Sequence, residues 1–150
     1  MKCPREGNSC SSELRRQHFV EREPPFLVLV LQRSFATYRC VDGVRQLEQH
    51  VKVNTAVEFP PVLDFMRSGT YDFKGVVHHQ GSGVGGGRYV ATCSLGLGPR
   101  DEEVFGVFSD NAPVKCKPWA YLETDAVQRE AYMLLYARRE YAEPRPAYAV

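Results

Sequence analysis

The stretch YDFKGVVHHQGSGVGGGRYVATCSLGLGPRDEEVFGVFSD, residues 71–110, decides the fold of this chain. Three runs in it, residues 71–79, 89–95 and 104–108, are rich in Val, Phe, Tyr and Thr, a composition typical of β-strands. Glycine and charged residues fill the breaks between the runs, which indicates turns. The first two runs are therefore predicted to form a hairpin with a long tip, and the third run is predicted to pair with the second.

The glycine-rich link between the first two runs has the spacing G-x-G-x-x-G through Gly81, Gly83 and Gly86. In a phosphate-binding loop a helix must follow this motif, because the amides at the helix N-terminus bind the phosphates. Here the strand-like sequence YVATC follows, and the chain contains no Gly-Lys-Ser/Thr. The link is therefore predicted to be a flexible hairpin tip rather than a nucleotide site.

Composition sets the outer limits of the interpretation. The 150 residues suffice for one domain with a hydrophobic core, and the net charge of +1 predicts no nucleic-acid partner. The N-terminus lacks the apolar segment of a secretory signal, and the longest apolar run, residues 26–31, is too short to span a bilayer, so no membrane partner is expected. The five scattered cysteines are expected to be reduced, in the cytoplasm or nucleus.

Two more strands are predicted outside the opening stretch. Residues 26–31 form a continuous apolar run between a proline pair and Gln32, which indicates a strand buried on both faces. Residues 132–137, YMLLYA, supply the last strand. We expect all five strands to lie in one twisted antiparallel sheet, so the predicted fold class is mainly β.

The connections carry local signals as well. Asp-Gly at residues 42–43 predicts a two-residue hairpin turn. Thr124 is suited to cap a short helix that runs to Glu130. Residues 114–122 contain or border two prolines and are expected to be irregular, with Trp119 as a packing anchor.

Six short motifs then follow in an order that resembles the C-terminal half of the ubiquitin-specific protease domain. They are LQRSF at 31–35, FPPVLD at 59–64, HQG at 79–81, GRY at 87–89, FSD at 108–110 and AYMLLYAR at 131–138. The family counterparts of the first two are Leu-Lys-Arg-Phe and Phe-Pro-x-x-Leu-Asp. The next two correspond to His-Ser-Gly and Gly-His-Tyr, and the last two to Asn-Asp or Asp-Asp and Ala-Tyr-x-Leu-x-Tyr. The resemblance implies an α+β family fold, here its palm half, and thiol-dependent cleavage of the isopeptide bond after ubiquitin's C-terminal glycine. It implies ubiquitin or a ubiquitinated protein as partner, and no cofactor.

The resemblance places the catalytic positions at Arg88, Ser109 and Asp110. In the family a cysteine thiolate attacks, a histidine takes its proton, and an Asn or Asp orients the histidine. Arg88 stands at the histidine position, and its guanidinium stays protonated, so it cannot be the base. Ser109 and Asp110 stand at the Asn/Asp positions. No nucleophile is assigned, because the family's cysteine lies far upstream and Cys40 and Cys93 are expected to be inert thiols buried in strands.

The resemblance also assigns substrate binding to four residues along the strand beside which ubiquitin's tail runs in the family. These residues are His79, Gly81, Gly87 and Tyr89. No metal site is predicted.

The domain boundaries follow from the motifs. Residues 1–23 are a polar segment with Cys3 and Cys10, whose spacing exceeds the gap of about two to four residues that zinc ligands show. Residues 24–140 form the partial domain that resembles the protease, and residues 141–150 are expected to be a flexible tail.

Three functions stay open at this stage. The chain could be an incomplete and inactive protease domain, or a pseudoenzyme that still binds ubiquitin's tail or another protein partner. It could also be a β-rich interaction domain whose motifs only preserve core packing. An ion pair between Arg88 and Asp110 is a further hypothesis about the former catalytic site.

Overall fold

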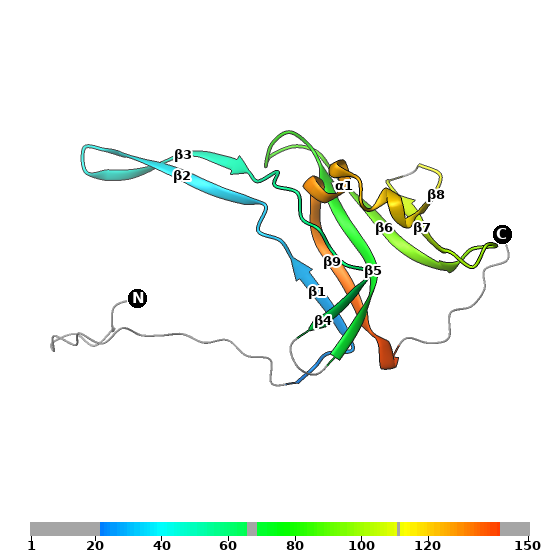
Figure 1. Ribbon diagram of the computed structural model, residues 1–150. Helices are drawn as coiled ribbons and strands as arrows, with labels where there is room; N and C mark the ends of the chain where they lie inside the picture. The colour runs from blue at the N-terminus through cyan, green and yellow to red at the C-terminus, as the bar shows by residue number, and fades with distance from the viewer. Residues whose placement is uncertain (1–21, 66–68, 111, 142–150) are drawn as a thin grey trace.

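A computed structural model describes residues 22–65, 69–110 and 112–141 (Figure 1). The predicted N-terminal segment up to residue 21, with Cys3 and Cys10, and the predicted tail from residue 142 lie outside the described residues. Within the described ranges the chain is mostly strand, with one α-helix and two short 3-10 helices. None of the helices in these ranges is long and apolar enough to cross a membrane.

Strands dominate the order of elements along the described part of the chain. The elements are β1 (Phe26–Val30), β2 (Ser34–Val41), β3 (Val44–Lys52), β4 (Val62–Phe65), β5 (Gly69–Gln80), β6 (Arg88–Leu97), β7 (Glu103–Phe108), β8 (Lys115–Pro118), η1 (Trp119–Tyr121), α1 (Asp125–Glu130), β9 (Ala131–Arg138) and η2 (Arg139–Tyr141).

Seven of the strands form one twisted antiparallel sheet in the order β1-β9-β5-β6-β7-β8, with β4 paired to β5 (Figure 1). All five predicted strands lie in this sheet. The predicted hairpin is β5–β6, whose tip spans residues 81–87, and the third run of the opening stretch pairs with the second as β6–β7. The mainly β fold class is therefore confirmed.

The strands β2 and β3 form a separate two-stranded ribbon that projects away from the sheet (Figure 1). Asp42 and Gly43 both have positive φ, 52° and 76°, which is the backbone that a tight two-residue turn requires. The hairpin turn predicted at these two residues is confirmed.

The core lies on the face of the sheet that α1 and η1 cover. Phe73 is at its centre, since its ring lies within 5.3–6.1 Å of four other aromatic rings, measured between centroids. Those rings belong to Phe59, Phe105, Trp119 and Tyr136. Aromatic pairs at this spacing stabilise a core beyond the apolar area that they bury. Trp119 is the packing anchor that the sequence predicted.

Strand β1 corrects one expectation. It was predicted to be buried on both faces, but Phe26, Val28 and Val30 are 60%, 50% and 59% exposed. Only the alternate residues Leu27 and Leu29 pack against the core. The reason is that β1 is the edge strand of a sheet with one covered face, so every second side chain points away from the core.

Two other expectations were also wrong. Residues 114–122 were expected to be irregular, yet they contain β8, which pairs with β7 at the edge of the sheet, where a proline at a strand end is tolerated. Cys40 was expected to be buried, yet it is exposed, because the ribbon formed by β2 and β3 has no described layer packed on it. Cys93 is half-buried, and burial raises the pKa of its thiol.

The helix α1 begins and ends where the sequence predicted. Thr124 is its N-cap residue, but its hydroxyl donates to the carbonyl of Tyr121 at 2.8 Å rather than accepting from the helix amides. The first helical hydrogen bond runs from the Gln128 amide to the Thr124 carbonyl at 3.1 Å. The helix position was therefore predicted correctly, while the side-chain cap was not.

Candidate functional site

The predicted site residues divide between two faces of the β5–β6 hairpin. Arg88 pairs with Gln80 and Tyr89 pairs with His79 across the two strands. Consecutive residues of a strand point to opposite faces, so Arg88 and Gln80 face one side while Tyr89 and His79 face the other. Each side has its own hollow, and no described residue lines both.

The first hollow, hereafter the Arg88 cavity, has a volume of about 380 Å³. It lies over the ends of β6, β7 and β8 beside η1, and two predicted catalytic positions, Arg88 and Ser109, meet in it. Asp110, the third, is exposed in the turn after β7 and does not line the cavity. The lining consists of Gln80, Arg88, Val90, Val107, Ser109, Ala112, Pro113, Lys115, Lys117 and Tyr121.

Arg88 is held across the hairpin rather than across the cavity. Its Nε donates to Oε1 of Gln80 at 3.0 Å. Among the described residues it forms no ion pair, so the one hypothesised with Asp110 is not formed. The two terminal nitrogens of the guanidinium take no part in the hydrogen bond to Gln80.

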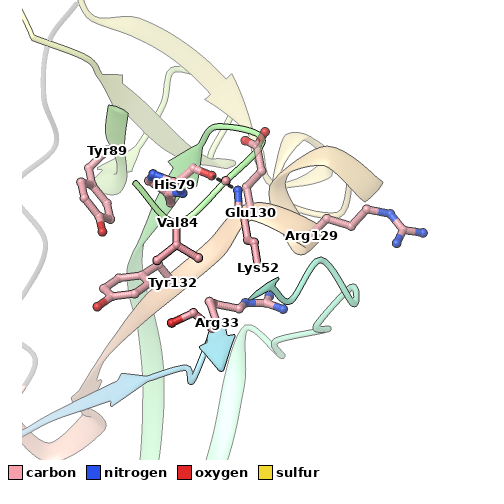
Figure 2. A pocket seen from close by; sticks show the side chains of 10 residues that line it. Arg33, Lys52, His79, Val84, Tyr89, Arg129, Glu130 and Tyr132 are labelled. Carbon is pink, nitrogen blue, oxygen red and sulfur yellow. Dashed lines mark hydrogen bonds between the residues drawn. The ribbon is translucent and has the colours of Figure 1, made fainter. Parts of the chain in front are cut away.

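The second hollow, hereafter the His79 pocket, is smaller, at about 50 Å³ (Figure 2). A row of three rings borders it, with centroids 5.0 Å apart for His79 and Tyr89 and 5.4 Å apart for Tyr89 and Tyr132. Tyr89 is 55% exposed, so one face of this row meets solvent. The lining consists of Arg33, Ser34, Lys52, His79, Gly83, Val84, Tyr89, Arg129, Glu130 and Tyr132.

The glycines at the two ends of the hairpin tip are required by close packing. A Cβ at Gly87 would lie 2.7 Å from Nε2 of His79 and closer still to the carbonyl oxygen of Gln80, and Gly87 has a φ of 134°. A Cβ at Gly81 would lie 2.9 Å from the Cα of Gly87. Both residues were predicted to bind substrate, and the structure places them where they close the tip beside His79.

Lys52 fixes the same tip from β3. Its Nζ donates to the carbonyl oxygens of His79 at 3.0 Å and Gly81 at 2.5 Å, as Figure 2 shows for His79. No sequence signal predicted this role, because the contact is between a side chain and backbone carbonyls 27 and 29 residues away in the chain.

Arg33 forms the floor of the His79 pocket and is also a residue whose role the sequence did not reveal. Its side chain is 8% exposed and donates to three carbonyl oxygens: Ala131 at 2.6 Å, Thr55 at 2.6 Å and Gln128 at 3.0 Å. Burial lowers the pKa of this guanidinium below its usual value. Arg33 thereby ties the segment after β1 to the end of α1 and the start of β9.

His78, rather than His79, is the buried histidine. It is fully buried, with Nε2 3.2 Å from Oγ1 of Thr92 and Nδ1 3.6 Å from Oε2 of Glu130. Burial lowers the pKa of His78, and this effect outweighs the opposite effect of Glu130. The His78 imidazole is thus enclosed in the protein beside a hydroxyl and a carboxylate, and it lines neither hollow.

These arrangements limit the chemistry of the described residues. Neither a described cysteine nor a described histidine lines the Arg88 cavity, and none of Cys40, Cys93 and Cys116 lines the His79 pocket. Within the described ranges, a thiol and its base therefore do not meet in either hollow. No group of three or more His, Cys, Asp or Glu side chains in the same ranges is placed to hold a metal ion.

Two comparisons with known proteins bear on this site. The family model described as ubiquitin carboxyl-terminal hydrolase matches residues 1–136, a range that includes both hollows. None of the curated proteins matches the chain.

Proposed function

This chain belongs to the ubiquitin carboxyl-terminal hydrolase family, and we propose that it binds ubiquitin through the His79 pocket without hydrolysing ubiquitin bonds by itself. The observation that carries the proposal is the composition of the Arg88 cavity. Arg88 and Ser109 stand together in it at the family's base and orienting positions, and no described cysteine or histidine accompanies them.

The loss of hydrolysis follows from the chemistry of Arg88. Its guanidinium remains protonated at any working pH, so it cannot remove the proton of an attacking thiol. Ser109 has a neutral hydroxyl, which stabilises an imidazolium less than a carboxylate does. The members of a catalytic unit act together, and the loss of one costs nearly as much as the loss of all. We therefore propose a pseudoenzyme, as far as the chain's own residues are concerned.

The retained binding rests on the opposite face. The ring row of His79, Tyr89 and Tyr132 offers apolar area with polar edges, which is the composition of residues that dominate binding interfaces. By resemblance, ubiquitin's tail runs beside the strand that begins at Arg88. Gly87, with no side chain, lets the hairpin tip pack closely against His79 and so fixes one end of the ring row.

A second candidate, a β-rich module for another protein partner, is favoured by one observation. Large apolar side chains are exposed on β1 and on the β2–β3 ribbon, away from both hollows. They are Phe26, Val28, Val30, Phe35, Tyr38, Val44 and Leu47. Exposed apolar groups that gather on one surface often mark a binding site.

The test combines a hydrolysis assay with a binding assay. We expect no release of a fluorophore from the C-terminus of ubiquitin, with iodoacetamide as the control, and alkylation-sensitive turnover would overturn the proposal. In a titration of isotope-labelled ubiquitin followed by NMR, Tyr89→Ala should weaken binding about tenfold, as expected for an aromatic anchor.

Phe26→Ala is the matched control, because it also removes an exposed ring. Phe26 pairs with Ala137, at the opposite end of β9 from Tyr132. The substitution should leave the ubiquitin affinity unchanged. Loss of ubiquitin binding in Phe26→Ala alone would overturn the His79 pocket as the ubiquitin site and place that site on the exposed apolar residues of β1. The absence of any shift in the ubiquitin spectrum would overturn ubiquitin binding.

A further inference from the structure

The lining of the Arg88 cavity carries an excess of positive charge, although the Glu130 carboxylate lies near enough to Tyr121 to act on its phenol. Arg88, Lys115 and Lys117 line it, and no Asp or Glu is among the described residues of its lining. Over the whole sequence the charges nearly cancel, at a net +1. The local excess is therefore a property of this cavity rather than of the chain.

None of these three cations has an ion pair with a carboxylate within the described ranges. Arg129, Arg138 and Arg139 each form an ion pair with a described carboxylate. By contrast, Arg88 uses only its Nε, and Lys117 has its Nζ 5.7 Å from the centroid of the Tyr121 ring.

Strand register explains why the charges converge. Lys115 pairs with Val107 and Lys117 pairs with Phe105, so the two lysines are two residues apart on one face of β8. Val107 lies between Lys115 and β6, and it gives the cavity an apolar wall together with Val90. An apolar wall lowers the local dielectric and strengthens the field of the charges above it.

Two neutral hydrogen-bond donors line the Arg88 cavity in addition to the three cations. The hydroxyl groups of Ser109 and Tyr121 both belong to residues of the lining. Burial raises the pKa of Tyr121, and Glu130 raises it further, so the phenol keeps its proton at neutral pH. Both hydroxyls are therefore available to donate to an anionic ligand.

We propose that the Arg88 cavity binds the phosphate group of a small phosphorylated molecule. A phosphate carries about two negative charges and three acceptor oxygens, which suits three cations and two hydroxyl donors better than a singly charged carboxylate does. Arg88 can offer a pair of parallel N–H donors, while the lysines act as point charges. The volume of about 380 Å³ is within the range of small-molecule sites. This site is distinct from the proposed ubiquitin site, since the two hollows lie on opposite faces of the hairpin.

The experiment titrates the isotope-labelled full chain with inorganic pyrophosphate, inorganic phosphate and sodium acetate at low ionic strength. We expect saturable amide shifts in residues 88–90, 107–110, 112 and 114–117 with pyrophosphate, weaker shifts with phosphate, and none with acetate at the same concentration. Salt at about 0.5 M should abolish the shifts, because the added ions screen the attraction between the exposed cations and the phosphate.

Variants assign the effect to the cavity. Arg88→Gln and Lys115→Gln should each weaken pyrophosphate binding about three- to tenfold, as for one charge-assisted hydrogen bond at a partly exposed site. Lys74→Gln, on β5 outside the cavity, is the matched control and should bind as the parent does. Since Arg88 and Lys115 are exposed, both variants should fold, and their spectra show whether they do.

The remaining outcomes overturn the proposal. They are the absence of saturable shifts, equal binding by the parent and both cavity variants, and acetate binding as tight as that of phosphate. The last result would make the cavity a carboxylate site instead. Because the salt arm uses the parent chain alone, the proposal stays testable even if a variant fails to fold.

Discussion

The two faces of the β5–β6 hairpin differ in how their side chains are held. On the face with His79, three rings contact one another in a row, Lys52 donates to the tip carbonyls and Arg33 donates to three more carbonyls. On the face with Arg88, the side chains border an open cavity. Because consecutive strand residues point to opposite faces, a substitution at Arg88 leaves the packing around Tyr89 in place. The side chains of one face of the hairpin can therefore change while the other face keeps its packing.

The largest expected effect comes from removing the anchor of the His79 face. Arg33→Ala leaves three carbonyl oxygens without their donor and should lower the free energy of unfolding by about 3 kcal/mol. Urea denaturation measures this change. The control Arg39→Ala, at an exposed position of β2, should change it by less than about 0.5 kcal/mol. A loss below about 1 kcal/mol for Arg33→Ala would show that this face is not held as described.

The next effect concerns Gly87, which closes the hairpin tip between Gln80 and His79. Gly87→Ala puts a Cβ against Gln80 and His79 at a φ of 134°, so it should cost about 2 kcal/mol. Gly85→Ala is the matched control, because a Cβ there meets nothing within 4 Å. Thermal unfolding of the two variants in parallel measures the difference. If both variants melted together, the tip would not be closed by Gly87.

A smaller effect concerns the buried His78 and the pH dependence of the free energy of unfolding. Burial lowers the pKa of His78 in the folded protein below its usual 6.5, so the unfolded state binds the proton first. Stability should then be complete above about pH 6.5 and should decrease as the pH falls toward the folded-state pKa. Urea midpoints between about pH 8 and about pH 5 measure this slope.

His78→Gln should flatten that pH dependence, while His50→Gln, at an exposed position of β3, should leave it unchanged. A stability that rises as the pH falls in this window would mean that Glu130, and not burial, controls His78.

The last prediction is that hydrolysis at the ubiquitin C-terminus does not change. Arg88→His combined with Ser109→Asn would supply, on the Arg88 face, the two residue types that the resemblance places at these positions. No described cysteine lines that cavity, so fluorophore release from the ubiquitin C-terminus should stay at the background level. Turnover by the double variant that iodoacetamide abolishes would show that a thiol reaches the cavity after all.

Local signals predicted most of the fold. Strand composition placed the five strands of the sheet, and Asp42 with Gly43 defined the turn of the ribbon, because both depend on nearby residues. The exposure of Val28 could not be predicted this way. It depends on the position of β1 at the sheet edge, which is a property of the whole topology.

The site was predicted less completely than the fold. Motif order brought Arg88 and Ser109 to one cavity, and strand alternation separates them from Tyr89. The roles of Arg33 and Lys52 were not predicted, because their partners are backbone carbonyls far along the chain. Every residue has a backbone carbonyl, so the sequence does not identify which one accepts the hydrogen bond. Hydrogen bonds of this kind become visible only once the strands are assembled.

The position of β9 in the sheet affects when the sheet can form during protein synthesis. This strand lies between β1 and β5, although it is the last described strand of the chain. During synthesis at about 5–20 residues per second, β1 must wait several seconds for β9, and Arg33 waits as long for Ala131, 98 residues away, although Thr55 is made sooner. The apolar side chains of β1 stay unpaired for that interval. The nascent chain therefore reaches its final sheet only when residues 131–138 have left the ribosome.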